Sequence, residues 1–287
     1  MVQPVQWFPG HMAKTRRKIT EDLKLVDIVV ELLDARIPES SSNPVLREII
    51  KNKPRVVVLN KKDLADANQT ARWVSAFESQ NLKAIPVESK TGKGIPALFR
   101  RIREELEPQI AKWNQKGMAG RPIRIMVLGI PNVGKSSMIN RMILGGNAGK
   151  AEVRDKPGVT RQNRWFTVGK GFELLDTPGV LWPKFEDPVV GEHLAFTGAI
   201  RDEILDFEGL AGRLLETLAA LYPQAIANRY KLDGSALQLA GHELLEQVGR
   251  KRGMLIAGGE IDLERAAVMV LDEFRGGKMG PVTLEWI

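Results

Sequence analysis

Apolar residues follow two different patterns along the chain. Short runs of branched aliphatic residues, typical of strands buried on both faces, lie at 27–33, 55–59, 83–87 and 123–128. Apolar residues at helical spacing alternate with these runs and predict helices over 13–24, 44–53, 67–80 and 95–116. Two further short runs, 165–168 and 172–175, predict a hairpin. Strands that alternate with helices indicate an α/β fold with a mainly parallel sheet covered on both faces.

In the last third of the chain the pattern indicates helices alone. Leucine residues at helical spacing predict two helices, which include residues 210–221 and 237–248. Asp262 is expected to cap a third helix over 263–274. The sequence therefore predicts an α/β domain over residues 1–185, followed by a small all-α domain over residues 186–287.

Composition restricts the class of protein. The chain of 287 residues is 43% hydrophobic, which is enough for packed cores in two domains of medium size. No apolar run approaches the ~20 residues that cross a bilayer, and we expect no signal peptide and no membrane partner. The sequence has no cysteine, which excludes disulfides, thiolate catalysis and cysteine-ligated zinc. Such a chain fits a reducing compartment, so we expect a cytoplasmic protein.

The formal net charge of +7 hides an asymmetry. Residues 1–184 carry 32 Lys and Arg against 18 Asp and Glu, whereas residues 185–287 carry 10 against 17. A basic balance attracts polyanions such as nucleic acid. The alternative is a solvated surface that only aids solubility. If nucleic acid is the partner, its attraction comes mainly from the first two thirds of the chain.

A phosphate-binding pattern follows the run at 123–128. Gly129 and Gly134 enclose four residues, and Lys135 and Ser136 come next, before a predicted helix over 137–144. In this strand–loop–helix context, backbone N–H groups of the loop and the helix start surround a phosphate chain. Lys135 is expected to bind the β- and γ-phosphates and act in catalysis, and the Ser136 hydroxyl to bind Mg²⁺. The nucleotide-binding residues expected here are Asn132, Val133, Gly134, Lys135, Ser136 and Ser137.

A guanine-binding pattern, Asn60-Lys61-Lys62-Asp63, comes at the end of the run at 55–59. The Asp63 carboxylate can accept hydrogen bonds from N1–H and N2–H₂ of guanine, a donor pair that adenine lacks. The Asn60 amide can either brace the loop or reach the base, and the Lys61 stem can cover the purine face. Ser89 and Lys90 resemble the loop that contacts the guanine carbonyl through its backbone. These residues predict GTP rather than ATP.

The remaining parts of a GTPase site come after the phosphate loop. Asp176 is expected to reach Mg²⁺ through water, and the Gly179 N–H to contact the γ-phosphate. Thr160 fits the threonine that closes on Mg²⁺ when the γ-phosphate is present. Common GTPases carry the phosphate loop first and the guanine motifs last, whereas this chain has the reverse order. The same sheet forms if the ordinary termini are joined, and the helix predicted over 95–116 makes that join.

With this motif order, the chain resembles the circularly permuted P-loop GTPases that assist ribosome assembly, in particular the bacterial ribosome biogenesis GTPase A family. The resemblance also rests on Trp7-Phe8-Pro9-Gly10-His11-Met12, on Asp34-Ala35-Arg36-Ile37-Pro38 and on the region from Gly258 to Lys278. It implies a monomeric GTPase that acts on a late large-subunit (50S) precursor and binds its rRNA in a nucleotide-dependent way. It also implies an RNA-contacting helical domain. Because residues 185–287 are acidic in balance, we expect that contact to be a local patch such as Arg250-Lys251-Arg252.

Hydrolysis needs a group that positions water, and small GTPases use a glutamine directly after the glycine that corresponds to Gly179. This chain has Val180 there, which cannot hydrogen-bond water. The resemblance points to His11 as the catalytic replacement, with a structural or RNA-contacting histidine as the alternative. It also matches Asn132 to an asparagine that binds K⁺ beside the phosphates. The alternative for Asn132 is a side chain that only braces its loop.

Two other functions fit parts of the pattern. A tRNA-modification-type GTPase shares the hydrophobic residue after Gly179 and the asparagine at the position of Asn132. A non-catalytic, GTP-dependent RNA-binding clamp would use the same nucleotide motifs without useful turnover. A comparison of hydrolysis with and without ribosomal particles separates the clamp from the enzyme.

Overall fold

The computed structural model describes residues 9–144, 153–154, 165–175, 187–200 and 206–287, and of residues 9–15 it describes the backbone alone. Within these ranges, seven strands form one sheet in the order β3-β2-β1-β4-β7-β6-β5. Their bounds are β1 Ile28–Asp34, β2 Arg55–Asn60, β3 Lys83–Pro86, β4 Ile123–Gly129, β5 Val153–Arg154, β6 Trp165–Val168 and β7 Phe172–Leu175. Strands β1, β2, β3, β4 and β7 run parallel, whereas β6 is antiparallel to both of its neighbours. The predicted strands and hairpin are thereby confirmed.

Helices cover both faces of the sheet, as the continuous apolar runs predict. Every residue of β1 is buried, and alternate residues of this strand enter different clusters. Val30 and Leu32 pack with the cluster that contains α4 (Ile95–Glu105) and α6 (Lys135–Leu144). On the opposite face, the apolar residues pack against α1 (Pro9–Asp22), α2 (Pro44–Ile50) and α3 (Ala67–Ser79). A short 3₁₀ turn, Leu23–Leu25, follows α1.

The prediction of one helix over 95–116 is wrong, because the segment forms two helices. Helix α4 ends at Glu105, Leu106 leaves the helical conformation at φ −97° and ψ 6°, and α5 covers Glu107–Gln115. Pro108 has no N–H to donate to the carbonyl of Glu104, and its ring crowds that carbonyl. The four-residue apolar spacing continues through this position and therefore conceals the break. The two helices together still connect β3 to β4, as was expected of the single helix.

Residues 187–200 and 206–275 contain helices and no strand. The helices are α7 Pro188–Phe196, α8 Phe207–Leu221, α9 Pro223–Tyr230, α10 Gly241–Lys251 and α11 Leu263–Arg275. A 3₁₀ turn, Ala236–Gln238, lies between α9 and α10. The Asp262 cap of α11 is confirmed, since its Oδ1 accepts a hydrogen bond from Arg265 N at 3.0 Å. Helices α7 and α9 were not predicted. The predicted domain boundary, at residues 185 and 186, falls outside the described residues and stays a prediction.

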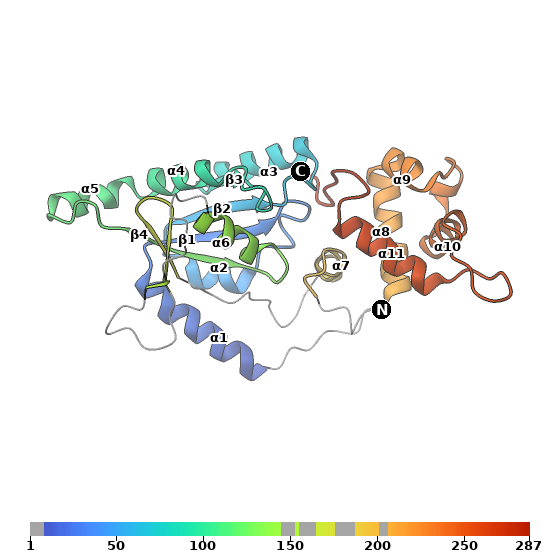
Figure 1. The fold of residues 1–287 in the computed structure, drawn as a ribbon, viewed down its shortest axis with the longest axis horizontal. Helices are drawn as coiled ribbons and strands as arrows, with labels where there is room; N and C mark the ends of the chain where they lie inside the picture. The colour runs from blue at the N-terminus through green and yellow to red at the C-terminus, as the bar shows by residue number, and fades with distance from the viewer. Residues whose placement is uncertain (1–8, 145–152, 155–164, 176–186, 201–205) are drawn as a thin grey trace.

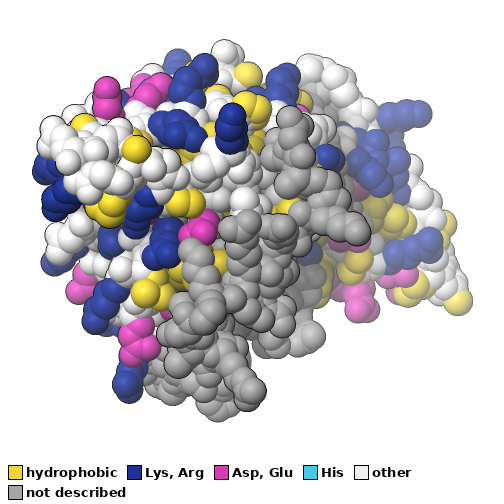
Figure 2. All heavy atoms as spheres, turned by 60° about the vertical axis from the view of Figure 1, so that its left-hand side comes forward, with side chains coloured by type: hydrophobic (Ala, Val, Ile, Leu, Met, Phe, Trp, Pro, Cys, Tyr) yellow, Lys and Arg dark blue, Asp and Glu magenta, His cyan; other side chains and the backbone are white. Residues whose placement is uncertain are grey.

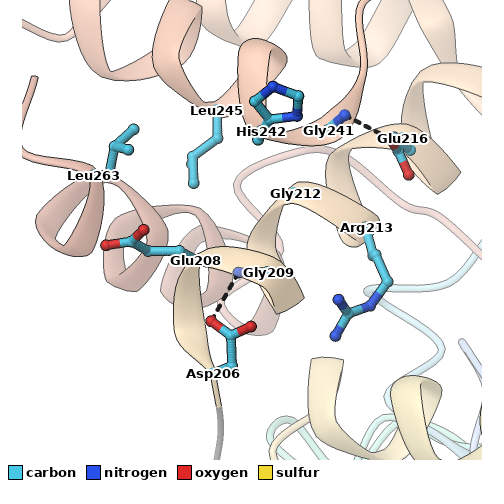
Figure 3. Close-up of a pocket in the computed structure, with 10 residues that line it drawn as sticks. All are labelled: Asp206, Glu208, Gly209, Gly212, Arg213, Glu216, Gly241, His242, Leu245 and Leu263. Atoms are coloured by element: carbon cyan, nitrogen blue, oxygen red, sulfur yellow. Dashed lines mark hydrogen bonds between the residues drawn. The ribbon is translucent and has the colours of Figure 1, made fainter. Parts of the chain in front are cut away.

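Helix α8 is central to this helical part and is packed against α10 and α11 (Figure 1). Gly212 of α8 and Gly241 of α10 allow the close approach drawn in Figure 3. A Cβ at Gly241 would lie 2.5 Å from the Gly212 carbonyl oxygen. The Glu216 carboxylate of α8 accepts from the Gly241 N–H at 2.5 Å, which satisfies a backbone donor at the start of α10. A single side chain therefore joins the two helices at the point where their backbones meet.

After α11 the chain returns to the sheet, and its C-terminus lies beside α3 (Figure 1). Val282 N donates to Leu64 O at 3.0 Å, and Leu284 N donates to Arg36 O at 2.8 Å. Thr283, between them, is fully buried. Residues 279–287, here called the C-terminal segment, thus contact the loops that follow β1 and β2. Among the helices that are described, none combines the length and the apolar character needed to cross a bilayer.

Candidate functional site

The predicted nucleotide motifs meet at one edge of the sheet. Strands β3, β2, β1 and β4 are neighbours and parallel, so the loops that follow them leave at the same edge. This edge, at the carboxyl ends of the strands, is where open α/β sheets bind ligands. The guanine motif follows β2, Ser89 and Lys90 follow β3, and the phosphate loop follows β4. The reversed motif order therefore still gives one site.

The phosphate loop has the backbone shape that an anion site requires. Asn132 and Gly134 adopt positive φ angles of 57° and 99°, which turn successive N–H groups toward one side. Gly134 tolerates no side chain, because a Cβ there would lie 2.3 Å from Asn60 Nδ2. Helix α6 begins directly after it, at Lys135, so the positive end of the helix adds to the N–H groups. The loop can bind a phosphate chain.

The start of α6 offers the oxygen ligand that Mg²⁺ prefers. Ser136 lies in the first turn of α6 and is exposed, and a hydroxyl oxygen is a suitable ligand for this hard cation. The described residues contain no cluster of three or more His, Asp or Glu that could hold a metal alone. A Mg²⁺ ion at Ser136 would thus depend on phosphate oxygens and on the predicted ligands Thr160 and Asp176, which lie outside the described residues.

Asn60 links all three loops through one buried amide. Its Nδ2 donates to Val133 O of the phosphate loop at 2.7 Å. Its Oδ1 accepts from Ser89 N at 3.1 Å and from Ser89 Oγ at 2.7 Å. Both ends of the amide are thereby engaged within the protein. Of the two roles that the sequence left open for Asn60, this geometry supports bracing of the loops over contact with the base.

Lys61 belongs to a buried charge network at the end of β1. Its backbone has a φ of 60°, and its Nζ lies 3.0 Å from Asp34 Oδ2. Arg36 binds the same carboxylate with two parallel hydrogen bonds, Nε to Oδ1 at 3.0 Å and Nη2 to Oδ2 at 2.8 Å. Burial disfavours the charged form of Asp34, but the charges of Arg36 and Lys61 outweigh it and hold the pKa of this carboxyl below its usual range. Burial lowers the pKa of Lys61, and Asp34 opposes that change.

This network fixes the Lys61 stem at the expected base site. Asp34 and Arg36 were quoted from the sequence only as part of a family motif, and their contact with Lys61 was not predicted. The sequence did contain a signal for charged side chains at a strand end, since Asp-Ala-Arg directly follows the run at 27–33. The sequence alone does not show that β1 and β2 are neighbouring strands or that Asp34 pairs with Asn60 in their register.

A pocket of about 220 Å³ opens between these loops. It is lined by four residues of the loop 60–64, by Ser89 and Lys90, by Gly134 and Ser137, and by Arg275 at the end of α11. Asp63 is exposed at this pocket, so its carboxylate is accessible to a base. The loop with Lys90 is tied to α6, because Arg141 Nε donates to Lys90 O at 2.8 Å. The structure thus brings together the guanine motif, the Ser89–Lys90 loop and the phosphate loop.

Four of the predicted site residues are not placed by the described part of the chain. Thr160, Asp176 and Gly179 lie outside the described residues, as does Val180. The backbone of His11 lies in the first turn of α1, and its side chain is outside the described residues. The roles expected for these residues stay predictions.

Asn132 makes a contact that the sequence did not predict. Its Nδ2 donates to Gly198 O, just after α7, at 2.6 Å. The phosphate loop is therefore tied directly to the helical part of the chain. Because the amide nitrogen is used in this contact, Oδ1 is the atom of Asn132 suited to a cation.

A second pocket, of about 300 Å³, lies between α8 and α10 (Figure 3). Two of its acidic side chains have structural partners: Asp206 Oδ1 accepts from Gly209 N at 3.0 Å, and Glu216 accepts from Gly241 N. Arg213, at its edge, pairs with Glu192 of α7 at 2.6 Å. These contacts cap and join helices, and this pocket contains none of the predicted site residues.

Comparisons with known proteins find relatives that match nearly the whole chain. A family model described as "50S ribosome-binding GTPase" matches residues 124–207. The ribosome biogenesis GTPase A of Bacillus licheniformis is 45% identical over 281 residues, which cover 98% of this chain and 98% of the relative. The protein of the same name from Thermotoga maritima is 31% identical over 98% of this chain and 94% of its own.

Solved structures of similar fold match most of the chain. The GNP-bound YlqF from T. maritima matches with a TM-score of 0.66 and 27% identity, covering 95% of this chain and 98% of that one. A GDP-bound YlqF structure matches with a TM-score of 0.68 over 94% and 99% of the two chains. These likenesses confirm the predicted fold, a circularly permuted P-loop GTPase sheet followed by helices.

Proposed function

Because this chain belongs to the ribosome biogenesis GTPase A family and is therefore a GTP hydrolase, we propose that it acts on a late precursor of the large ribosomal subunit. In the GTP state it binds the particle and its rRNA, and hydrolysis allows it to leave. The proposal that the protein binds GTP rests on the contacts of Asn60. The amide of this residue joins the guanine, Ser89 and phosphate loops in one site. We further infer that the protein is a cytoplasmic monomer without a membrane partner.

Each motif has a proposed role in GTP binding. Asp63 reads the guanine edge, the Lys61 stem lies against the purine, and Ser89 and Lys90 bound the base. The phosphate loop binds the phosphates through its N–H groups and Lys135. Mg²⁺ would be held by Ser136, Thr160 and, through water, Asp176, and when bound it neutralises charge on the β- and γ-phosphates. Gly179 contacts the γ-phosphate in this proposal.

Hydrolysis is proposed to use His11 and a K⁺ ion in place of a glutamine. Val180 stands at the glutamine position and cannot orient water. His11, in the first turn of α1, is the proposed positioning group. Asn132 is held by Gly198 through its nitrogen, so its oxygen is available to bind K⁺ near the phosphates. A cation there stabilises the charge that develops in the transition state.

A basic surface on the GTPase part supports an rRNA partner. Figure 2, turned so that the α5 end comes forward, shows many more Lys and Arg than acidic side chains on this face. Exposed basic residues of α4 and α5 include Arg100, Arg103 and Lys112, and Lys116 follows directly after α5. Such a surface attracts phosphate groups independently of sequence, and its binding weakens as salt rises. We propose that it provides the main attraction, with residues 250–252 as a smaller contact.

Sedimentation with ribosomal particles tests the proposed function. We expect the protein to co-sediment with large-subunit precursors in a non-hydrolysable GTP analogue, and to stay free with GDP or with mature subunits. Lys135→Ala should lose the analogue-dependent binding, because the β- and γ-phosphates lose their cation. The proposal would be contradicted if particle binding were the same with the GTP analogue and with GDP, and the same for Lys135→Ala and the unaltered protein.

The same preparations distinguish an enzyme from a non-catalytic clamp. Hydrolysis of GTP should rise when the cognate particle is added, and replacement of K⁺ by Na⁺ should slow it. A particle that binds the protein without any effect on hydrolysis would favour the clamp.

A further inference from the structure

One wall of the nucleotide pocket comes from the helical part of the chain. Arg275 is the last residue of α11, yet it lines the pocket together with Asp63, Lys90 and Ser137. It was not predicted as a site residue, because it lies 212 positions after Asp63 and matches no nucleotide motif. A positively charged guanidinium in a pocket that is expected to bind a nucleoside phosphate would attract the negatively charged phosphate groups.

The guanidinium is held at one edge by α7. Arg275 Nε donates to Phe196 O at 3.1 Å, and Nη2 donates to Ala195 O at 2.9 Å. Both carbonyls lie at the C-terminal end of α7, the negative end of that helix, which favours a cation. A guanidinium carries five N–H donors in a rigid fork. Arg275 thus holds the end of α7 and also lines the pocket.

Neighbouring contacts bring Arg275 close to both the base loop and the phosphate loop. Gly277, two residues further, lies against Leu64, since a Cβ there would be 2.4 Å from Leu64 Cδ2. Arg275 itself lies against Gly198, because a Cβ at Gly198 would be 3.3 Å from Arg275 Nε. Gly198 is the residue whose carbonyl accepts from Asn132 of the phosphate loop. Arg275 therefore lies near the loops that are expected to bind the base and the phosphates of one nucleotide.

We propose that Arg275 is a nucleotide-binding residue that contacts the ribose–phosphate part of the bound guanine nucleotide. This inference rests on the assignment of the pocket to GTP and GDP. It makes the helical part of the chain a direct component of the nucleotide site. Movement of α11 away from the sheet would then remove a cation from the nucleotide.

The affinities of the full-length protein for GDP and for guanosine test this proposal, measured by equilibrium dialysis at fixed salt. Loss of a hydrogen bond to a charged group corresponds to about tenfold or more in affinity. We expect Arg275→Met to weaken GDP binding by at least about tenfold and to change guanosine binding far less. Arg265→Met is the matched control, because Arg265 is an exposed arginine of the same helix outside the pocket. It should bind both ligands as the unaltered protein does.

Two outcomes would overturn the proposal. One is an Arg275→Met variant that binds GDP as Arg265→Met does. The other is an equal loss for GDP and guanosine, which indicates a displaced α7 rather than a lost phosphate contact. If Arg275→Met does not fold, Arg275→Gln takes its place with the same expectation, since it keeps N–H donors for the α7 carbonyls but no charge.

Asp63→Asn separates this inference from the function on which it rests. If Asp63→Asn weakens both ligands while Arg275→Met behaves as the control, only the role of Arg275 fails. If Asp63→Asn changes neither ligand, the pocket is not the guanine site, and the broader assignment fails as well.

Discussion

Asn60 and Asp63 lie three residues apart in one loop but have opposite environments. Asn60 is 1% exposed and uses both ends of its amide within the protein. Asp63 is exposed at the pocket. The sequence could predict a base-reading role for Asp63, because a carboxylate at that position can accept from N1–H and N2–H₂ of guanine. It could not choose a role for Asn60, since that depends on where the loops after β3 and β4 lie.

The carboxylate of Asp63 should determine the choice of base. Asp63→Asn should weaken GTP binding by about 10²–10⁴-fold, because two charge-assisted hydrogen bonds are lost at about 1.5–3 kcal/mol each. Xanthosine triphosphate should gain relative to GTP, since the amide donates to the carbonyl that replaces the 2-amino group. Competition between the two nucleotides measures the change. Asp272→Asn, at an exposed position of α11, is the control, and a variant that keeps the original preference for GTP would contradict this role.

At the scale of elements, the sequence predicted strands better than helices. Runs of buried aliphatic residues gave β1 to β4 within one or two residues, because most side chains of such a strand are apolar. Helix α9 was missed, since its eight residues bury only Ile226 and Tyr230. Helix α7 was missed because its residues are apolar on several sides and show no stripe, although Asp187 and Pro188 are start signals. Apolar spacing also concealed the break at Leu106.

The crossing of α8 and α10 should depend on the lack of a side chain at Gly241. Gly241→Ala places a methyl group 2.5 Å from Gly212 O, and such overpacking costs about 1–3 kcal/mol. We expect the free energy of unfolding in urea to fall by that amount. Gly234→Ala is the matched control, because nothing lies within 4 Å of its added Cβ; it should change stability by at most about 0.5 kcal/mol. Equal stability of the two variants would show that the helices can separate without cost.

For the whole molecule, the main finding that the sequence did not predict is the path of the chain after α11. Arg36 is 1% exposed and donates through Nη1 to Phe274 O at 3.3 Å. Ser40 N donates to Glu285 Oε1 at 3.0 Å, and Trp73 Nε1 donates to Glu285 O at 2.9 Å. Periodicity and motif spacing report only local order. They carry no signal for contacts between residues that are more than 200 positions apart.

The C-terminal segment should stabilise the GTPase part. A protein that ends at Gly280 loses the buried side chains of Val282 and Leu284, each of which contributes about 1.5–3 kcal/mol. We expect the free energy of unfolding to fall by roughly 3–6 kcal/mol, measured by denaturant titration. Removal of Ile287 alone, which is 48% exposed, is the control and should have little effect. Equal unfolding curves for both shortened proteins would contradict a stabilising role.

The path of the C-terminal segment has a consequence for synthesis of the protein. The Thr283 hydroxyl donates to Ala35 O, and these residues are 248 positions apart. At roughly 5–20 residues per second, translation of that interval takes roughly 12–50 s. During this time the loop with Asp63 has emerged, but the strand-end contacts at Arg36 and Leu64 are unfilled and Arg275 has not been made. A nascent chain therefore carries the guanine and phosphate motifs before Arg275 exists, and the proposed nucleotide pocket gains this wall only after translation has passed residue 275.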